Sequence, residues 1–160
     1  MVQGFEGMRG KSAIVTGGAT LIGAGVVRAL HQAGVRVVVA DINAEAGQAL
    51  ADELGDGVLF SRTDITDDTQ VAACVALAAA RHGGVNYLVN LACSYLDDGI
   101  ASPRADWLAS LNVNLVSAVM VLKAVRPHFQ QAGGGAVVNF TSISSGVAQT
   151  GRWLYPVGKA

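Results

Sequence analysis

The chain has 160 residues, which is enough for one domain, and 51% of them are hydrophobic while only 14% are charged. Its net charge of −1, without a basic run, argues against nucleic acid or an acidic membrane surface as a partner. The N-terminal segment MVQGFEGMRGK lacks the apolar core of a signal peptide, and no uncharged apolar run reaches the roughly 18 residues of a membrane-spanning helix, so we expect a cytoplasmic protein.

Short apolar segments alternate along the chain with segments of helical periodicity. Strands are expected at residues 12–16, 35–40, 58–63, 87–90 and 136–140. Helices are expected at residues 24–33 and 44–54, after a cap at Thr66 or Asp67, and from Ser102-Pro103 to the glycines at 133–135. The last of these helices carries one apolar side: Trp107, Leu111, Leu115, Val119 and Leu122.

Strand and helix alternate five times with short connections. This pattern predicts an α/β fold in three layers, with a doubly wound parallel sheet that has helices on both faces, as in a Rossmann-like domain. The sequence has no internal repeat and no interdomain linker. We therefore expect residues 1–160 to belong to a single domain.

The junction between the first strand and the first helix holds Gly17, Gly18 and Gly23. In a doubly wound fold this junction binds phosphate, because backbone amides and the positive end of the helix attract the anion and glycine allows its close approach. The spacing here does not match G-x-G-x-x-G, so a plain strand-to-helix turn is the alternative.

Asp41 ends the second strand about twenty residues further on. A carboxylate at this place can accept hydrogen bonds from both ribose hydroxyls of an adenosine and would repel a 2′-phosphate. The alternative is a structural role, in which Asp41 or Asn43 caps the next helix. Asp64, after the third strand, has the same two interpretations.

The segment from Thr141 to Lys159 holds three groups suited to proton transfer, namely Ser142, Tyr155 and Lys159. Tyr155 and Lys159 stand four apart, so a helix would place them on one face, where the ammonium favours the phenolate. A serine hydroxyl can bind the oxygen that gains or loses the proton. The structural alternative is an aromatic ring packed under a lysine stem. By chemistry alone, Ser144 and Ser145 are equally good serines.

These motifs together resemble those of the short-chain dehydrogenase/reductase family, from Ser12 to the last residue. The motifs follow each other in the family's order: T-G-x-x-x-G-x-G at Thr16–Gly23, an aspartate at Asp64-Ile65, part of N-N-A-G at Asn90–Cys93, a helix asparagine at Asn114, and Ser142 thirteen residues before the Y-x-x-x-K of Tyr155 and Lys159.

The resemblance implies an NAD-dependent enzyme that transfers a hydride between NAD and a secondary alcohol or ketone. Tyr155 would be the general acid and base, Ser142 would bind the substrate oxygen, and Lys159 would make the tyrosine more acidic and hold the nicotinamide ribose. Asn114 would hold a water that links Lys159 to solvent. The implied cofactor contacts are Gly17, Thr20, Leu21, Ile22, Gly23, Asp41, Asp64, Ile65, Asn90, Ala92, Tyr155 and Lys159. Asp41 favours NAD over NADP.

The implied partners are a small-molecule substrate and further copies of the chain, as a dimer or tetramer. The family's extended branch, the sugar-nucleotide epimerases and dehydratases, is a rival, but it would want a glycine where Thr20 stands. A catalytically silent NAD-binding regulatory protein of the same fold is the second rival, although such proteins tend to lose the tyrosine or the lysine.

Four positions depart from the family pattern. Leu21 replaces the middle glycine, so a left-handed backbone there would cost about a kcal/mol or more. Leu91 and Cys93 replace an asparagine and a glycine, and Cys93 would narrow the wall beside the nicotinamide ribose. Pro156 disfavours helical geometry at Tyr155, so we expect the helix to begin at Pro156 with Tyr155 at its cap.

Metal and disulfide chemistry find little support. The three histidines lie far apart without the spacing of metal ligands, so no metal site is expected. Cys74 and Cys93 are interpreted as buried or half-buried free thiols, as is usual in a reducing cytosol. Tyr95 and Trp153 lie next to the catalytic segments and either line the substrate pocket or pack as ordinary aromatic residues.

The fifth strand, AVVNF, is apolar on both faces like a central strand, but no sixth strand follows it. An uncovered apolar edge favours aggregation, and a helix carrying the catalytic pair needs about three turns to bury an apolar stripe. We therefore expect these residues to be the N-terminal two-thirds of a protein of roughly 250 residues, or a partner chain to cover the edge.

Overall fold

The computed structural model describes residues 6–160. The five strands are β1 (Ser12–Thr16), β2 (Arg36–Asp41), β3 (Val58–Arg62), β4 (Tyr87–Asn90) and β5 (Ala136–Asn139). The α-helices are α1 (Leu21–Gln32), α2 (Ala44–Leu54), α3 (Asp68–His82), α4 (Arg104–Leu111), α5 (Ser117–Gln131) and α6 (Leu154–Gly158). Short 3₁₀ turns are η1 (Glu6–Met8), η2 (Gly99–Ala101) and η4 (Ile143–Ser145).

The strands form one parallel sheet in the order β3-β2-β1-β4-β5. The chain moves outward from β1 to β3 and then crosses back to β4 on the other side of β1. The strand order therefore reverses between β1 and β4, where Thr16 pairs with Asn90. In open parallel sheets this reversal opens a crevice at the carboxyl ends of the strands, which is where ligands bind.

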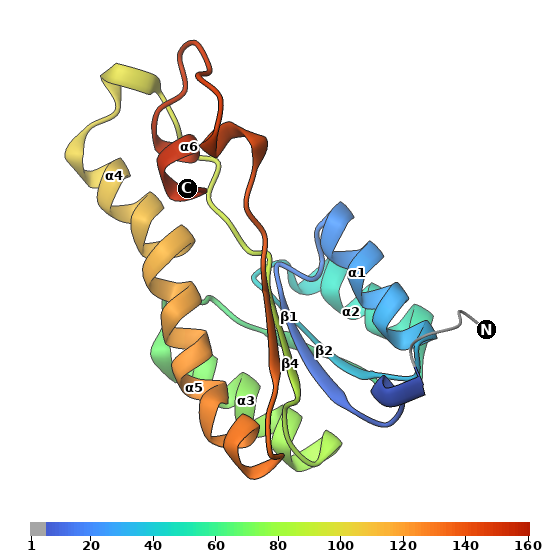
Figure 1. The fold of residues 1–160 in the computed structure, drawn as a ribbon. Coiled ribbons are helices and arrows are strands. Elements are labelled where there is room, and N and C mark those ends of the chain that lie inside the picture. The colour runs from blue at the N-terminus through green and yellow to red at the C-terminus, as the bar shows by residue number, and fades with distance from the viewer. Residues whose placement is uncertain (1–5) are drawn as a thin grey trace.

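Two apolar layers cover the sheet, one on each face (Figure 1). On one face α3 and α5 bury Val75 and Val125 against strand residues such as Ile14 and Val38. On the other face α1 and α2 bury side chains such as Val27 against the intervening strand residues. Alternate residues of β1 and β2 thus face opposite layers, which explains why these strands are continuous apolar runs. The predicted doubly wound α/β fold is confirmed.

A continuous helical rod joins α4 to α5 through a π-helical segment, Asn112–Val116. The whole rod, Arg104–Gln131, is long and apolar enough to cross a membrane by length and composition alone, which is weak evidence because helices of soluble cores pass the same test. The predicted apolar side is not the buried one: Leu115 and Val119 are exposed, and Ser117, Val121 and Val125 are buried instead.

Three predicted details of helix starts are wrong. The helix α1 begins at Leu21, three residues before the predicted start at residue 24; the φ of Leu21 is not positive, so the cost expected for a left-handed backbone there does not arise. The helix α4 begins after Pro103 without a side-chain cap, because the Ser102 hydroxyl accepts a hydrogen bond from the Asp98 amide. The helix α6 begins at Leu154, which places Tyr155 inside the first turn. Pro156 is tolerated there because first-turn amides have no partner within a helix.

Candidate active site

A pocket of about 510 Å³ lies at the carboxyl ends of the strands, where the strand order reverses. It is lined from β1, β2, β3 and β4 and by the rod that contains α4. Of the predicted cofactor contacts, six line it: Gly17, Thr20, Asp41, Asp64, Ile65 and Ala92. Cys93 also lines it, as expected from its place beside Ala92.

Gly17 is the point where the first loop passes close to the end of β4. Its φ is +65°, and a Cβ added to it would lie 2.8 Å from both the N and the Cα of Ala92. The Thr16 hydroxyl holds the two segments together, since it accepts hydrogen bonds from the amides of Leu91 (3.2 Å) and Ala92 (3.3 Å). Any side chain at position 17 would therefore separate the loop from β4.

The loop enters α1 through a side-chain cap. The Thr20 hydroxyl donates to the Gly17 carbonyl (2.8 Å) and accepts from the Gly23 amide (3.1 Å). A Cβ at Gly23 would lie on the Gly17 carbonyl oxygen, so the first turn of the helix presses directly on the loop. Leu21 and Ile22 expose their side chains, while their amides, as first-turn amides, have no acceptor within the helix. These amides are available to an anion.

Asp41 is buried at the end of β2 and faces the pocket. Its Oδ2 accepts a hydrogen bond from the Ala19 amide (2.9 Å) and its Oδ1 accepts one from the Asn43 amide (2.9 Å). The cap of α2 is Asn43, whose side chain accepts from the Ala46 amide. Asp41 is therefore no helix cap, and each of its oxygens keeps a second acceptor site.

Two other predicted cofactor residues have structural partners of their own. The Asp64 carboxylate accepts hydrogen bonds from the amide (2.9 Å) and the hydroxyl (2.7 Å) of Thr66, which shapes the turn after β3. The Asn90 side chain donates to the Asn139 side chain (2.9 Å) and so joins the ends of β4 and β5, with its Oδ1 buried without a partner among the described residues.

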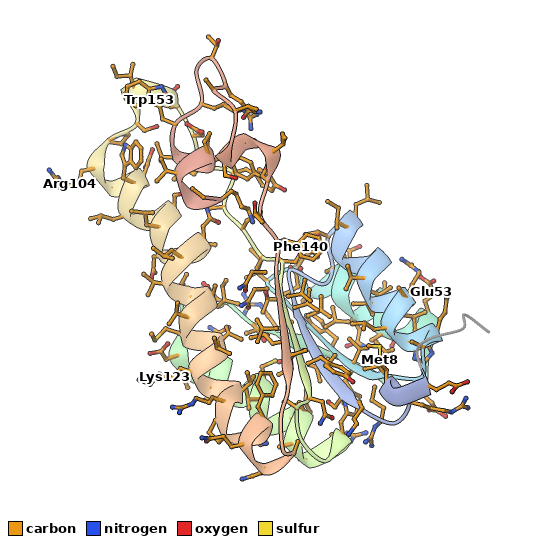
Figure 2. The ribbon with its side chains drawn as sticks, viewed as in Figure 1. Met8, Glu53, Arg104, Lys123, Phe140 and Trp153 are labelled. Atoms are coloured by element: carbon orange, nitrogen blue, oxygen red, sulfur yellow. The ribbon has the colours of Figure 1, made fainter. Side chains whose placement is uncertain are left out.

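The predicted catalytic segment, from Thr141 to Lys159, lies beyond the end of β5, outside the pocket lining. The Lys159 ammonium donates to the Phe140 carbonyl (3.1 Å). Phe140 lies at the place where the chain leaves the sheet (Figure 2). Ser142 caps η4, since its hydroxyl accepts from the Ser144 amide (3.2 Å) and donates to the Ser144 hydroxyl (3.1 Å). The helix α6 packs against η4, although within residues 6–160 no hydrogen bond joins the side chains of Ser142, Tyr155 and Lys159.

Asn114 lies in the π-helical segment, and its side chain reaches two neighbouring elements. Its Oδ1 accepts from the Ser94 amide (2.8 Å), and its Nδ2 donates to the Ser110 hydroxyl (3.2 Å). A Cβ at Gly158 would lie 2.5 Å from its Nδ2, so the last residue of α6, directly before Lys159, packs closely against this asparagine. Wide turns of this kind often occur at functional sites.

The loop after β4 contributes Tyr95, for which the sequence left pocket lining and ordinary packing open, and Asp97, which the sequence analysis did not place in the site. The rings of Tyr95 and Tyr155 stack with their centroids 5.1 Å apart and their planes at 18°. The pKa of Tyr95 is raised to about 12, mainly by the neighbouring Cys93 and further by burial and by Tyr155. The Asp97 carboxylate binds backbone amides of Trp153 and Tyr155 (3.0 Å each). One signal was available, because Trp153 cannot cap the helix that follows it.

A family model described as short chain dehydrogenase matches residues 11–160. The chain belongs to the short-chain dehydrogenase/reductase family. Two curated members are the 3-alpha-(or 20-beta)-hydroxysteroid dehydrogenase of Mycobacterium bovis, 38% identical over 143 residues, and the D-threitol dehydrogenase of Mycolicibacterium smegmatis, 36% identical over 154 residues. These matches cover 88% and 94% of this chain but 54% and 59% of the relatives, so the chain spans little more than half of their length.

Two solved structures of family members share the fold over nearly the whole chain. A 7 alpha-hydroxysteroid dehydrogenase complexed with NADH and 7-oxo glycochenodeoxycholic acid is 30% identical, with a TM-score of 0.91 over 99% of this chain and 64% of that one. A 3-ketoacyl-(acyl-carrier-protein) reductase from Brucella melitensis complexed with NADH is 25% identical, with a TM-score of 0.90 over 95% of this chain and 65% of that one.

The residues of this short-chain dehydrogenase/reductase chain fit a dinucleotide. Gly17 lets the loop after β1 lie directly against the end of β4, which leaves room above it for a ligand that crosses from β2 to β4. The first-turn amides of α1 suit a phosphate group. Asp41 adds a buried carboxylate at one end of the pocket, where two acceptor sites remain for hydroxyl donors. At the other end the pocket reaches Cys93 and Ser94, in the same loop as Tyr95, whose ring stacks on that of Tyr155.

Proposed function

We propose that the protein is an NAD-dependent oxidoreductase that acts on the CH–OH group of a secondary alcohol or on the corresponding ketone. The observation that carries this proposal is the anchoring of Lys159 on the Phe140 carbonyl. It sets Lys159 at the end of β5, beside the turn that Ser142 caps, with Tyr155 one helical turn earlier. Three groups suited to proton transfer thus lie at the same edge of the sheet as the pocket.

The bound nicotinamide cofactor would supply the hydride acceptor or donor. Tyr155 would give its proton to the ketone oxygen, or take it from the alcohol, as the general acid and base. The Lys159 ammonium, a fixed positive charge, favours the phenolate that remains after proton donation, and it would also bind the nicotinamide ribose. Ser142 would bind the reacting oxygen through its hydroxyl.

Asn114 would hold a water that passes protons between Lys159 and solvent. This role is supported by the contact of Asn114 with Gly158, which brings the Asn114 amide to the last residue of α6, directly before Lys159. The Asn114 side chain is in turn fixed by Ser94 and Ser110, so its position does not depend on the ligand.

We further infer that the cofactor is NAD rather than NADP. The Asp41 carboxylate faces the pocket with no lysine or arginine beside it in the sequence ADINAE. Arg62, its register partner on β3, forms no ion pair with it among the described residues, so a 2′-phosphate would meet the negative charge of Asp41. In this proposal residues 1–160 belong to one NAD-binding domain, and Leu21, Ile22, Ile65, Asn90 and Ala92 complete its cofactor contacts. The protein would act in the cytoplasm on a small molecule, as a homo-oligomer.

The first test is a cofactor-reduction assay with NAD against a panel of secondary alcohols, in wild type and in Tyr155→Phe. The variant is expected to keep NAD binding and to lose turnover by about 10²–10⁴-fold, because it removes the hydroxyl that would transfer the proton. Tyr87→Phe is the matched control, since Tyr87 begins β4 at the opposite end of the strand. A Tyr155→Phe variant that kept a tenth of wild-type kcat would show that Tyr155 is not the acid.

The alternative is a regulatory protein that binds the nucleotide without turning over an alcohol. The hydrogen bond between Asp41 and the Ala19 amide, in the loop after β1, would serve nucleotide binding in such a protein equally well. NAD binding without reduction in the whole alcohol and ketone panel would favour this alternative.

A further inference from the structure

The loop that follows β4, residues 91–99, contacts both Asn114 and the segment that holds Tyr155. On one side Ser94 exchanges hydrogen bonds with the side chain of Asn114. On the other side the Asp97 carboxylate reaches the start of α6, far along the chain. Its Oδ1 accepts from the Trp153 amide (3.0 Å) and its Oδ2 accepts from the Tyr155 amide (3.0 Å).

The start of α6 needs an acceptor that its own sequence does not supply. First-turn amides of a helix have no partner within the helix, and the residue before it normally provides a side-chain oxygen. Trp153 stands there and has no such oxygen. Asp97 takes this role from a distance of more than fifty residues in sequence. Burial raises the pKa of Asp97, but its amide hydrogen bonds outweigh burial and hold that pKa below the ordinary value.

Two further contacts join the same loop to the same segment. The Tyr95 ring stacks on the Tyr155 ring, so the loop fixes the side chain of Tyr155 as well as its backbone. Gly99 has a φ of +55°, and a Cβ there would lie 2.8 Å from the Gly151 carbonyl oxygen, so the two backbones are in direct contact. The Asp97 carboxylate also accepts a hydrogen bond from the Gly99 amide in its own turn (3.0 Å). A carboxylate that stabilised this turn only would make no bond to Trp153 or Tyr155.

We propose that Asp97 is a positioning residue for Tyr155. By accepting hydrogen bonds from the backbone amides at the start of α6, the Asp97 carboxylate keeps the Tyr155 ring stacked on Tyr95 and at a fixed place beside the cofactor pocket. The proposal rests on the proposed role of Tyr155. It assigns no contact between Asp97 and the substrate. Because a shift of about 1 Å in a reacting group can cost 10²-fold in rate, loss of this carboxylate should act on kcat rather than on cofactor binding.

The test compares Asp97→Ala with wild type in two measurements on the same protein. Amide hydrogen exchange is expected to speed up at Trp153 and Tyr155, and kcat is expected to fall by about 10–100-fold while the KM for NAD changes by less than about twofold. Asp97→Asn should be intermediate, because its amide group keeps one acceptor oxygen and replaces the other by a donor. Exchange should then speed up mainly at one of the two amides.

Asp98→Ala is the matched control, because Asp98 is the exposed neighbour of the same charge and its backbone amide, not its side chain, makes the hydrogen bond to Ser102. It should leave kcat and exchange unchanged. Unchanged exchange at Trp153 and Tyr155 in Asp97→Ala, or a kcat within about threefold of wild type, would overturn the proposal. If Asp97→Ala does not fold, Asp97→Asn alone decides it. A wild type that reduces no cofactor would instead contradict the proposed function, and the exchange measurement would still decide whether Asp97 fixes Tyr155.

Discussion

At the scale of single residues, Asp41 shows how one side chain can serve the fold and a ligand together. It accepts hydrogen bonds from the amides of Ala19 and Asn43, and these connect the loop after β1 to the turn after β2. Both bonds come from backbone amides and leave further acceptor sites on the same oxygens. A buried carboxylate at the pocket is costly unless such donors compensate it, and here the donors are built into the backbone.

The prediction at this scale concerns cofactor preference. Wild type should show a higher kcat/KM with NAD than with NADP, and Asp41→Asn should reduce the ratio of the two by about tenfold or more, because the negative charge that opposes the 2′-phosphate is removed. Asp56→Asn, an exposed position before β3, is the control. Steady-state kinetics with both cofactors measure the ratio. Equal kcat/KM values for NAD and NADP in wild type would contradict the assignment.

At the scale of elements, the helices differ in how their first turns are satisfied. The helices α1, α2 and α3 carry their own caps in Thr20, Asn43 and Asp67. Helix α6, which carries Tyr155, begins after a tryptophan and depends on another loop for its acceptor. The starts of α1, α2 and α3 are therefore encoded locally, whereas the start of α6 depends on a tertiary contact.

Asp67 gives a stability prediction at this scale. Hydrogen bonds from the Gln70 side chain, the Gln70 amide and the Thr69 amide, in this order of effect, hold the pKa of Asp67 below its ordinary value of 3.8. A lowered folded-state pKa stabilises the protein above the ordinary pKa, and this contribution is lost as the pH falls through the lower folded value. Asp67→Ala should lower the Tm by roughly 2–4 °C at neutral pH.

Thermal unfolding of Asp67→Ala and wild type at a series of pH values tests this. The difference in Tm should shrink at acid pH, where the carboxylate of the wild type is protonated. Asp68→Ala, one residue into the helix, is the control and should change the Tm less, since none of the described side chains or amides donates a hydrogen bond to Asp68. A difference in Tm that stays constant down to the lowest pH would show that the charge of Asp67 does not contribute.

At the scale of the whole molecule, helices and apolar side chains cover both faces of the sheet (Figure 1). The pocket lies at the carboxyl ends of the strands and is lined by residues at or after the ends of β1, β2, β3 and β4. A ligand in this pocket would contact loops from both halves of the sheet. Such a ligand binds the folded state alone, because the unfolded chain does not bring Asp41, Gly17 and Ala92 together. Binding must therefore raise the stability of the entire domain.

The prediction is a thermal shift. NAD at about one hundred times its Kd should stabilise the protein by about 2.7 kcal/mol, which corresponds to a rise in Tm of roughly 5–10 °C. NADP at the same concentration should raise the Tm less. Differential scanning calorimetry with and without each cofactor measures this without any turnover. An unchanged Tm at millimolar NAD would contradict the assignment of the pocket to the cofactor.

The sequence by itself determined the elements and their order. Apolar β-branched runs such as SAIVT and VRVVVA have one stable place, the centre of a parallel sheet, and the predicted helix at residues 44–54 agrees with the structure at both ends. The motif order also identified the family, because glycines and carboxylates at strand ends follow from local backbone requirements. These features are local in the chain, so local chemistry is sufficient to predict them.

Only the tertiary structure decided how the segment that holds Tyr155 is fixed in place. The sequence placed Tyr155 at a cap because Pro156 follows it, but Asp97 supplies the missing acceptor and lets the helix begin at Leu154. It also predicted an apolar side for the rod that leaves Leu115 and Val119 exposed. In both cases the deciding partner lies more than fifty residues away or is a surface formed by several elements, and no periodicity in the sequence carries that information.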